Sequence, residues 1–170
     1  MKLIKPTLKL KDQYLLALGE ALADTEGTTL TKPKINQSFT EFLNEINNES
    51  DANCLLPGRV PATTFWLIDR DEFIGRVQIR HLLNDWLLNY GGHIGYYIRP
   101  SKRKKGYGKK ILELALIEAK KMGLKKILVT CDETNTASIK IIEANGGVYE
   151  NTLPQGDGKP PKLRYWINVK

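Results

Sequence analysis

The sequence predicts an α/β (α+β) fold in which a mixed, mostly antiparallel sheet of about seven strands is flanked by about four helices. Residues 64–83 contain two β-branched and aromatic segments around a short polar insert, as in a hairpin. Residues 93–131 follow the order strand, helix, strand, which predicts a right-handed crossover between parallel strands. Two more strand-like segments surround a proline- and glycine-rich loop between residues 148 and 169.

The first elements are a short strand and two helices. Residues 1–7 alternate weakly between apolar and polar side chains, which is typical of an edge strand. Helical spacing then predicts a first helix from Tyr14, Leu15, Leu18 and Leu22. A second helix is predicted after Ser38, a residue type that caps helix N-termini, with an apolar stripe of Phe39, Phe42, Leu43 and Ile46.

The middle of the chain is predicted to form three strands. The hairpin strands are residues 64–68 and 73–83, and a connection leads from them to a strand over residues 93–98. This strand stops at Arg99 and Pro100, because proline cannot donate a ladder hydrogen bond.

The last third alternates helices and strands. Apolar side chains at helical spacing predict a long helix over residues 108–123, which ends in a glycine. Residues 126–131 are a buried type of strand, and a short helix over about 135–145 ends in two glycines. Strands near 148–149 and over 163–169 complete the prediction.

Length and composition favour one folded domain, residues 1–170. Apolar residues make up 41% of the chain and charged residues 26%, which excludes a disordered composition. Cys54 and Cys131 lie far apart and no Cys/His cluster has zinc-binding spacing, so we expect no metal and a reducing compartment. No apolar segment approaches the roughly 20 residues that span a bilayer, so we expect a cytoplasmic protein with no membrane partner.

Positive charge is concentrated in one segment. The net charge is +7, and residues 99–126 hold 11 Lys and Arg against two Glu, a local balance of +9. Such a segment indicates an anionic ligand, although a solvated, lysine-rich helix face would have the same composition. Nucleic acid is a disfavoured partner because Tyr107 is the single aromatic residue of the segment.

Residues 103–108, Arg-Lys-Lys-Gly-Tyr-Gly, lie between a predicted strand and the long helix. Gly106 and Gly108 would let the backbone approach a ligand, and the amides from Lys104 to Lys109 would point at an anion along the helix dipole. The charge and shape suit a pyrophosphate. GxxxxGK[ST] does not occur here, and GxGxxG would need a glycine at Ile111, so neither of these phosphate-binding loops is predicted.

Five features in order resemble the GNAT superfamily of N-acetyltransferases. They are a strand ending near Pro100, Arg-x-x-Gly-x-Gly at 103–108, a helix, a strand, and Asn135-Thr-Ala-Ser138 opening another helix. The resemblance covers residues 93–149 and implies one N-acetyltransferase domain, a sheet splayed at strands four and five, and acetyl-CoA as co-substrate. It also suggests a bulge in strand four, for which Gly95 is the candidate.

The resemblance assigns the cofactor contacts residue by residue. The loop would hold the CoA pyrophosphate, and the backbone of strand four would pair with pantetheine as an added strand would. The second motif would line the pantetheine, and a lysine after it would reach a phosphate. The cofactor-binding set is Tyr96, Tyr97, Ile98, Arg103, Lys104, Lys105, Gly106, Tyr107, Gly108, Lys109, Asn135, Ser138 and Lys140.

The same resemblance implies direct attack of a primary amine on the thioester in a ternary complex, with strand-four amides stabilising the developing negative charge. His93 is the candidate base because histidine titrates near neutral pH, and a packing role is its alternative. Many members carry a tyrosine acid seven residues after the motif asparagine, where this chain has Ile142. Tyr149 and Tyr165 are the candidate replacements. A packing role in the core is their alternative, and water could also protonate the leaving thiolate.

The sequence does not identify the acceptor. Residues 24–37, 47–63 and 151–162 should flank the acetyl end, and the acidic residues between Glu41 and Asp51 would either draw a cation or form a solvated helix face. A small amine, an antibiotic and a protein amine all stay open, as does a homodimer. The alternative function is a non-catalytic acyl-CoA-binding regulatory module, which stays open because the usual tyrosine is missing.

Overall fold

The computed structural model describes residues 1–24 and 29–169, so part of the expected 24–37 acceptor segment, residues 25–28, lies outside the described residues. The strands are β1 (Lys2–Ile4), β2 (Ala62–Asp69), β3 (Glu72–Arg80), β4 (Ile94–Ile98), β5 (Lys126–Asp132), β6 (Val148–Leu153) and β7 (Lys162–Asn168). The α-helices are α1 (Lys11–Leu22), α2 (Phe39–Asn48), α3 (Tyr107–Lys121) and α4 (Thr136–Glu143). The predicted fold class is confirmed. No helix in the described ranges is long and apolar enough to cross a membrane.

The strands form two antiparallel sheets, in the orders β1-β2-β3-β4 and β5-β7-β6, so the predicted splay between strands four and five is confirmed. The two sheets meet at His93, whose amide donates a hydrogen bond of 2.7 Å to the Leu128 carbonyl of β5. Gly92, at φ 63°, permits this approach, because a Cβ there would lie 2.7 Å from the same carbonyl oxygen.

The bulge expected at Gly95 does not form, so that expectation is wrong. The register between β3 and β4 is continuous from Ile94 to Ile98, with Gly95 opposite Gln78. The irregularity lies earlier, at Gly92 and His93, where the chain turns an amide from β3 toward β5. The sheets therefore diverge because the His93 amide bonds to β5 while its carbonyl bonds to β3, and β4 needs no extra, bulged residue.

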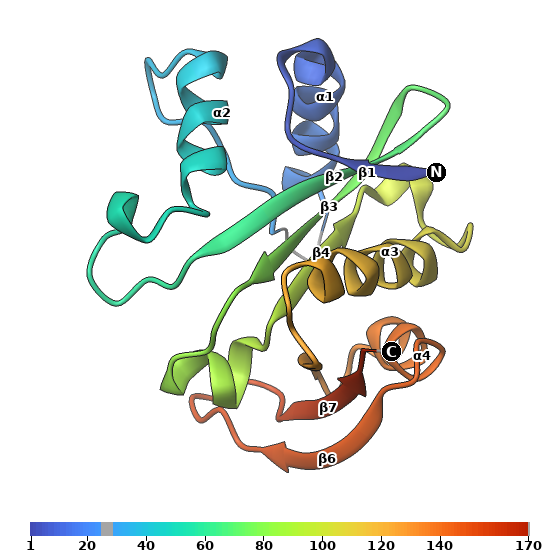
Figure 1. The fold of residues 1–170 in the computed structure, drawn as a ribbon. Helices are drawn as coiled ribbons and strands as arrows, with labels where there is room; N and C mark the ends of the chain where they lie inside the picture. The colour runs from blue at the N-terminus through green and yellow to red at the C-terminus, as the bar shows by residue number, and fades with distance from the viewer. Residues whose placement is uncertain (25–28, 170) are drawn as a thin grey trace.

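Helices cover both faces of the first sheet (Figure 1). On one face, α1 and α2 enclose an aromatic cluster in which Tyr14 stacks on Trp66 with ring centroids 4.8 Å apart. On the other face, α3 packs over β3 and β4, and its buried residues join those of β5 and β7 in a second core. The predicted stripe of α1 is partly wrong: Leu15 and Leu22 are exposed, because two alanines, at 17 and 21, let that side of the helix lie close to the sheet.

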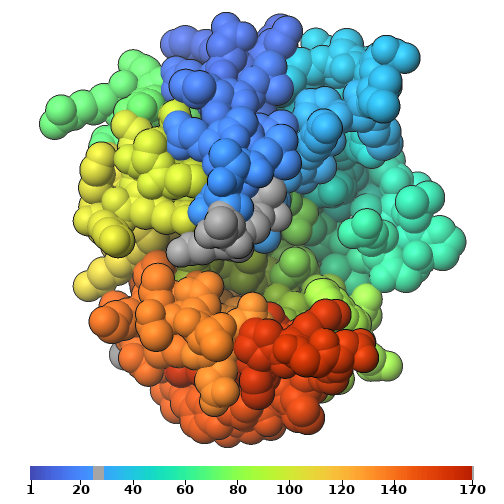
Figure 2. Space-filling view, turned by 180° about the vertical axis from the view of Figure 1, so that it is seen from behind, coloured from blue at the N-terminus to red at the C-terminus, as the bar shows by residue number. Residues whose placement is uncertain are grey.

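The space-filling view shows where the two sheets separate (Figure 2). The blue and yellow N-terminal and central parts lie above the orange and red C-terminal part, and a hollow with yellow-green atoms at its floor runs between them. The splay is therefore visible as a depression of the surface.

Candidate active site

The loop before α3 ends in an open helix N-terminus. Gly106 is the N-cap at φ 80°, a left-handed conformation that favours glycine, and no side chain among the described residues caps the helix. The first-turn amides of α3 have no partner within the helix, and Lys104, Lys105 and Lys109 are exposed around them. Gly108 has a different role, because a Cβ there would lie 2.4 Å from Ile141 Cδ1 of α4.

Ion pairs hold this loop from behind. Arg99, which is buried, donates from Nε and Nη2 to the carboxylate of Glu20 in α1, and its Nη1 lies 3.8 Å from Glu72 Oε1. The Ser101 hydroxyl donates to the same Glu20 carboxylate at 2.8 Å. Hydrogen bonds from Arg99, helped by those from Ser101, lower the pKa of Glu20 to about 2. Sequence reasoning missed this network because its partners are about 80 residues apart and neither belongs to a motif.

Two residues assigned to the pyrophosphate loop also anchor it. Arg103 donates from Nη2 to Asp24 Oδ2 at 2.6 Å, and its guanidinium lies 5.7 Å from the centroid of the Tyr97 ring. Tyr107 donates its hydroxyl hydrogen to Asp69 Oδ2 at 2.8 Å. Because these side chains point back into the protein, the open donors of the loop are its amides and its exposed lysines.

The antiparallel ladder determines which groups of β4 face the splay. The Arg80 amide donates to the His93 carbonyl at 2.8 Å, and the Arg99 amide donates to the Ile74 carbonyl at 3.1 Å. Because alternate residues of an antiparallel strand bond to the same neighbour, the backbone groups of the odd-numbered residues of β4 point toward β3. Tyr97 belongs to this set. The backbone groups at the other edge, which faces β5, are those of Ile94, Tyr96 and Ile98.

Tyr96 contributes more than its backbone. Its hydroxyl is buried next to Ser138 of α4 and makes no hydrogen bond to any residue that the structure describes. Burial raises the pKa of Tyr96 to about 12, with a smaller opposing effect of the Ser138 hydroxyl. Asn135 caps α4 by accepting the Ser138 amide at 2.9 Å, and Lys140 is exposed on the same helix. The side chain of Tyr96 therefore extends from β4 to the second motif.

His93 lies where the two sheets meet and is buried. Its Nδ1 accepts a hydrogen bond of 2.9 Å from the Leu128 amide, so backbone and side chain both bond to one residue of β5. Burial, and then the charge of Arg80, lower the pKa of His93 to about 4. The structure therefore gives His93 a position that joins the sheets.

The two candidate acids lie together on the second sheet. Tyr165 of β7 is 4% exposed and Tyr149 of β6 is 53% exposed, and their rings meet edge-on at 5.7 Å. Burial raises the pKa of Tyr165. The Tyr149 hydroxyl is 2.8 Å from Thr152 Oγ1. The structure brings these tyrosines to each other, whereas the open edge of β4 carries Tyr96.

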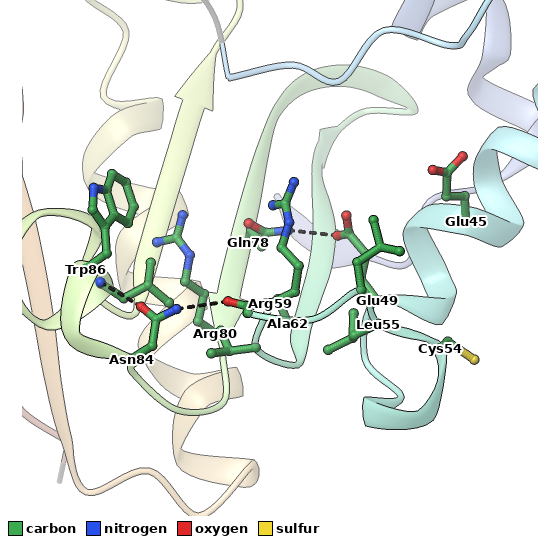
Figure 3. A pocket seen from close by; sticks show the side chains of 14 residues that line it. Glu45, Glu49, Cys54, Leu55, Arg59, Ala62, Gln78, Arg80, Asn84 and Trp86 are labelled. Atoms are coloured by element: carbon green, nitrogen blue, oxygen red, sulfur yellow. Dashed lines mark hydrogen bonds between the residues drawn. The ribbon is translucent and has the colours of Figure 1, made fainter.

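A pocket of about 460 Å³ lies on the α2 side of the first sheet (Figure 3). The end of α2, loop residues 54–60, β3 and the helical turn Leu87–Gly91 line it, so part of the expected 47–63 acceptor segment is here. Gln78 and Arg80 of β3 form its wall. Gln78 is the register partner of Gly95, and an Arg80 nitrogen lies 3.7 Å from the position of a Cβ on Gly95, so the pocket adjoins the middle of β4.

The candidate site combines a splayed β4 edge, a glycine turn at the N-terminus of α3 and an adjoining pocket. The chain matches the GNAT acetyltransferase domain model over residues 8–148 and belongs to that family. It is 33% identical over 66 residues to the uncharacterized N-acetyltransferase YfmK of Bacillus subtilis, a match that spans 39% of this chain and 45% of the relative.

Two similar solved structures support the fold. The microcin C7 self-immunity acetyltransferase MccE, in complex with acetyl-CoA and AMP, has a TM-score of 0.69 and 17% identity over 98% of this chain and 91% of its own. Spermidine N-acetyltransferase from Vibrio cholerae, in complex with CoA and spermine, has a TM-score of 0.68 and 18% identity over 99% of this chain and 95% of its own.

Proposed function

We propose that this chain transfers an acetyl group from acetyl-CoA to a primary amine by direct attack in a ternary complex. The observation that carries the proposal is the open edge of β4, which runs along the splay toward the uncapped N-terminus of α3. Membership in the GNAT family supports it, as do the ligands of the similar proteins, acetyl-CoA in MccE and CoA with spermine in the spermidine enzyme. When bound, acetyl-CoA supplies the acetyl group and a thiol leaving group.

The residues fit such a co-substrate along its length. The first-turn amides of α3, with Lys104 and Lys105, would hold the pyrophosphate, because a helix N-terminus and lysines favour an anion. The β4 edge would pair with the amide groups of pantetheine. Asn135 and Ser138 would line the other side of the arm, and Lys140 would reach a phosphate.

The β4 edge would also stabilise the charge that develops during attack. In this proposal the Tyr96 amide donates a hydrogen bond to the acetyl oxygen. The Tyr96 hydroxyl, whose pKa is raised to about 12, stays protonated and donates a hydrogen bond to the departing sulfur. Full proton transfer to a thiolate of pKa about 8.5 would be uphill, so water supplies that proton.

The amine must lose a proton, and we assign its acceptance to Glu49. Its carboxylate lies at the pocket wall, 2.8 Å from the Gln78 amide nitrogen, where water can relay the proton. His93 as the base stays a prediction, but its Nδ1 already accepts the Leu128 amide, which favours a positioning role. Tyr149 and Tyr165 as acids also stay predictions.

The test of the function follows free thiol while the protein, acetyl-CoA and a broad panel of primary amines are incubated together. We expect CoA release that depends on an amine. Acetyl-CoA binding without such release across the panel would contradict the proposal and support a regulatory module.

A pair of tyrosine variants tests the mechanism. Tyr96→Phe should lower kcat about 30-fold with little change in the Kd of acetyl-CoA, because a hydrogen bond to a charged group contributes about 2 kcal/mol. Tyr149→Phe, which removes an exposed hydroxyl, should leave kcat unchanged. A loss of kcat in Tyr149→Phe but not in Tyr96→Phe would instead assign the hydrogen bond to the leaving sulfur to Tyr149.

A further inference from the structure

The pocket beside β4 contains the guanidinium of Arg80, which is held by hydrogen bonds from one of its three nitrogens. Arg80 Nη1 donates to the carbonyls of Gly91 and Gly92, at 2.8 and 2.9 Å. Its Nη2 and Nε donate to no residue in the described part of the chain, and the side chain is half-buried. Two donors of a positioned arginine are therefore open to a ligand, in the planar arrangement that suits a carboxylate.

A second guanidinium reaches into the same pocket. Arg59 is exposed on the loop after α2 and forms neither a hydrogen bond nor an ion pair through its side chain with the residues described. Figure 3 shows Arg59 and Arg80 extending from the loop and from β3 beside Gln78 and Glu49. The pocket thus offers two positive groups from two different elements.

One carboxylate of the pocket is available to a cation. Glu49 Oε2 accepts from Gln78, which leaves its other oxygen without a hydrogen bond to the described residues. Glu45, also at the pocket, is bound to Lys34 Nζ at 2.7 Å and to Gln37 at 2.8 Å. Of Glu45 in α2 and Glu49, which follows its last residue, Glu49 therefore contributes the open carboxylate of the pocket.

We infer that the acceptor is an α-amino acid with an apolar side chain, whose carboxylate binds Arg80 and Arg59 and whose amine binds Glu49. The inference rests on the proposed function and names its substrate class. An α-carboxylate bound to Arg80 would lie beside Gly95 in the middle of β4. We place the amine, on the next carbon, between Glu49 and the thioester. The lining also includes the apolar or aromatic side chains of Leu55, Leu56, Trp86 and Leu87, together with the polar Asn84.

The charges disfavour a polyamine. A spermidine-like acceptor would place its cations next to two guanidiniums and would have one open carboxylate to pair with, and like charges at a contact cost several kcal/mol. Arg76, buried on the same face of β3, adds a third positive charge behind the wall. The pocket volume, about 460 Å³, suits a small molecule.

The experiment compares amines that differ by one carboxylate: phenylalanine with phenethylamine, and leucine with 3-methylbutylamine, with spermidine as a polycation. The readout is kcat/KM from CoA thiol release. We expect each amino acid to exceed its decarboxylated partner about 100-fold, since an unpaired binding group costs about 1–3 kcal/mol. Equal or better turnover of the simple amines, or of spermidine, would overturn the inference and leave the transferase proposal intact.

Variants assign the preference to the pocket. Arg59→Met should raise the KM for phenylalanine about 10-fold and should not raise that for phenethylamine, because this amine has no carboxylate that would lose a partner. Arg70→Met, the same change at an exposed turn between β2 and β3, is the matched control and should alter neither. A preference for amino acids that survives both Arg59→Met and Arg80→Lys would place the carboxylate elsewhere and contradict the assignment. If acetyl-CoA binds, as measured by a thermal shift, but no amine is turned over, both the transferase proposal and this inference are contradicted.

Discussion

The N-termini of α2 and α3 are built in opposite ways. At α2, the Ser38 hydroxyl accepts the Glu41 amide at 3.2 Å, and the Glu41 carboxylate accepts the Ser38 amide at 2.8 Å, so the helix uses its own side chains as a capping box. At α3, Gly106 has no side chain to accept a hydrogen bond, and three exposed lysines surround the turn.

The difference separates a helix end that serves stability from one that is free to bind. A missing cap costs a helix about 1 kcal/mol, yet α3 is the longest helix described and packs in the centre of the domain. The ion pair between Arg99 and Glu20 instead holds the loop that precedes α3. It lies on the protein side of the loop and does not cover the first-turn amides of α3. The N-terminus of α4 is closed like that of α2, because the side chain of Asn135 caps it.

The largest expected effect comes from giving α3 the cap that it lacks. Gly106→Asp places a carboxylate at the first-turn amides, where the pyrophosphate would bind, and no atom of the residues that the structure describes lies within 4 Å of the new Cβ. We expect the Kd of acetyl-CoA, measured by calorimetry, to rise about 100-fold, because each tenfold corresponds to about 1.4 kcal/mol and like charges at a contact cost more.

Gly123→Asp is the matched control, since Gly123 has φ 84° and equally open surroundings at the other end of α3. It should introduce similar backbone strain without changing the Kd. If Gly106→Asp binds acetyl-CoA as tightly as this control does, the open N-terminus is not the anion site.

The next effect tests the support behind the loop. Glu20→Gln should lower the free energy of unfolding at neutral pH by about 2 kcal/mol, since hydrogen bonds to charged groups are weakened. The folded pKa of Glu20, about 2, lies below its ordinary value, so the stabilisation is present above pH 5 and is lost as pH falls from about 5 toward 2. Urea unfolding of both proteins at pH 7 and pH 3 should show the difference shrink, and a constant difference would argue against an ionic origin.

A smaller effect is expected at α2. Ser38→Ala removes the accepting hydroxyl of the capping box and should lower the free energy of unfolding by about 1 kcal/mol. The Kd of acetyl-CoA should stay the same, because this N-terminus is closed by its own side chains. Weaker acetyl-CoA binding in this variant would erase the functional distinction between the two helix ends.

The smallest effect concerns the lysines beside α3. Lys104→Gln with Lys105→Gln should raise the Kd of acetyl-CoA about fivefold at low salt, since both side chains are exposed and screened. The difference from the unmodified protein should narrow as salt is added. The pair Lys120→Gln with Lys121→Gln, at the far end of α3, is the control, and an equal loss there would indicate a diffuse field rather than a local site.

The sequence by itself predicted the elements and their order, because the signals are local. Ser38 marked the start of α2, and the glycines at 106 and 123 marked the loop before α3 and its end. The five ordered features within residues 93–149 were enough to indicate the family, which the domain match confirmed.

Tertiary structure decided which atoms of the candidate site are open, because that depends on partners far along the chain. Arg103, assigned to the pyrophosphate, is held by Asp24, and the Tyr96 hydroxyl extends to a helix 42 residues later. His93 bonds to Leu128, a contact that no spacing indicates. Local sequence patterns determine backbone conformation within a few residues, whereas burial and pairing of a side chain follow from how the sheets and helices pack.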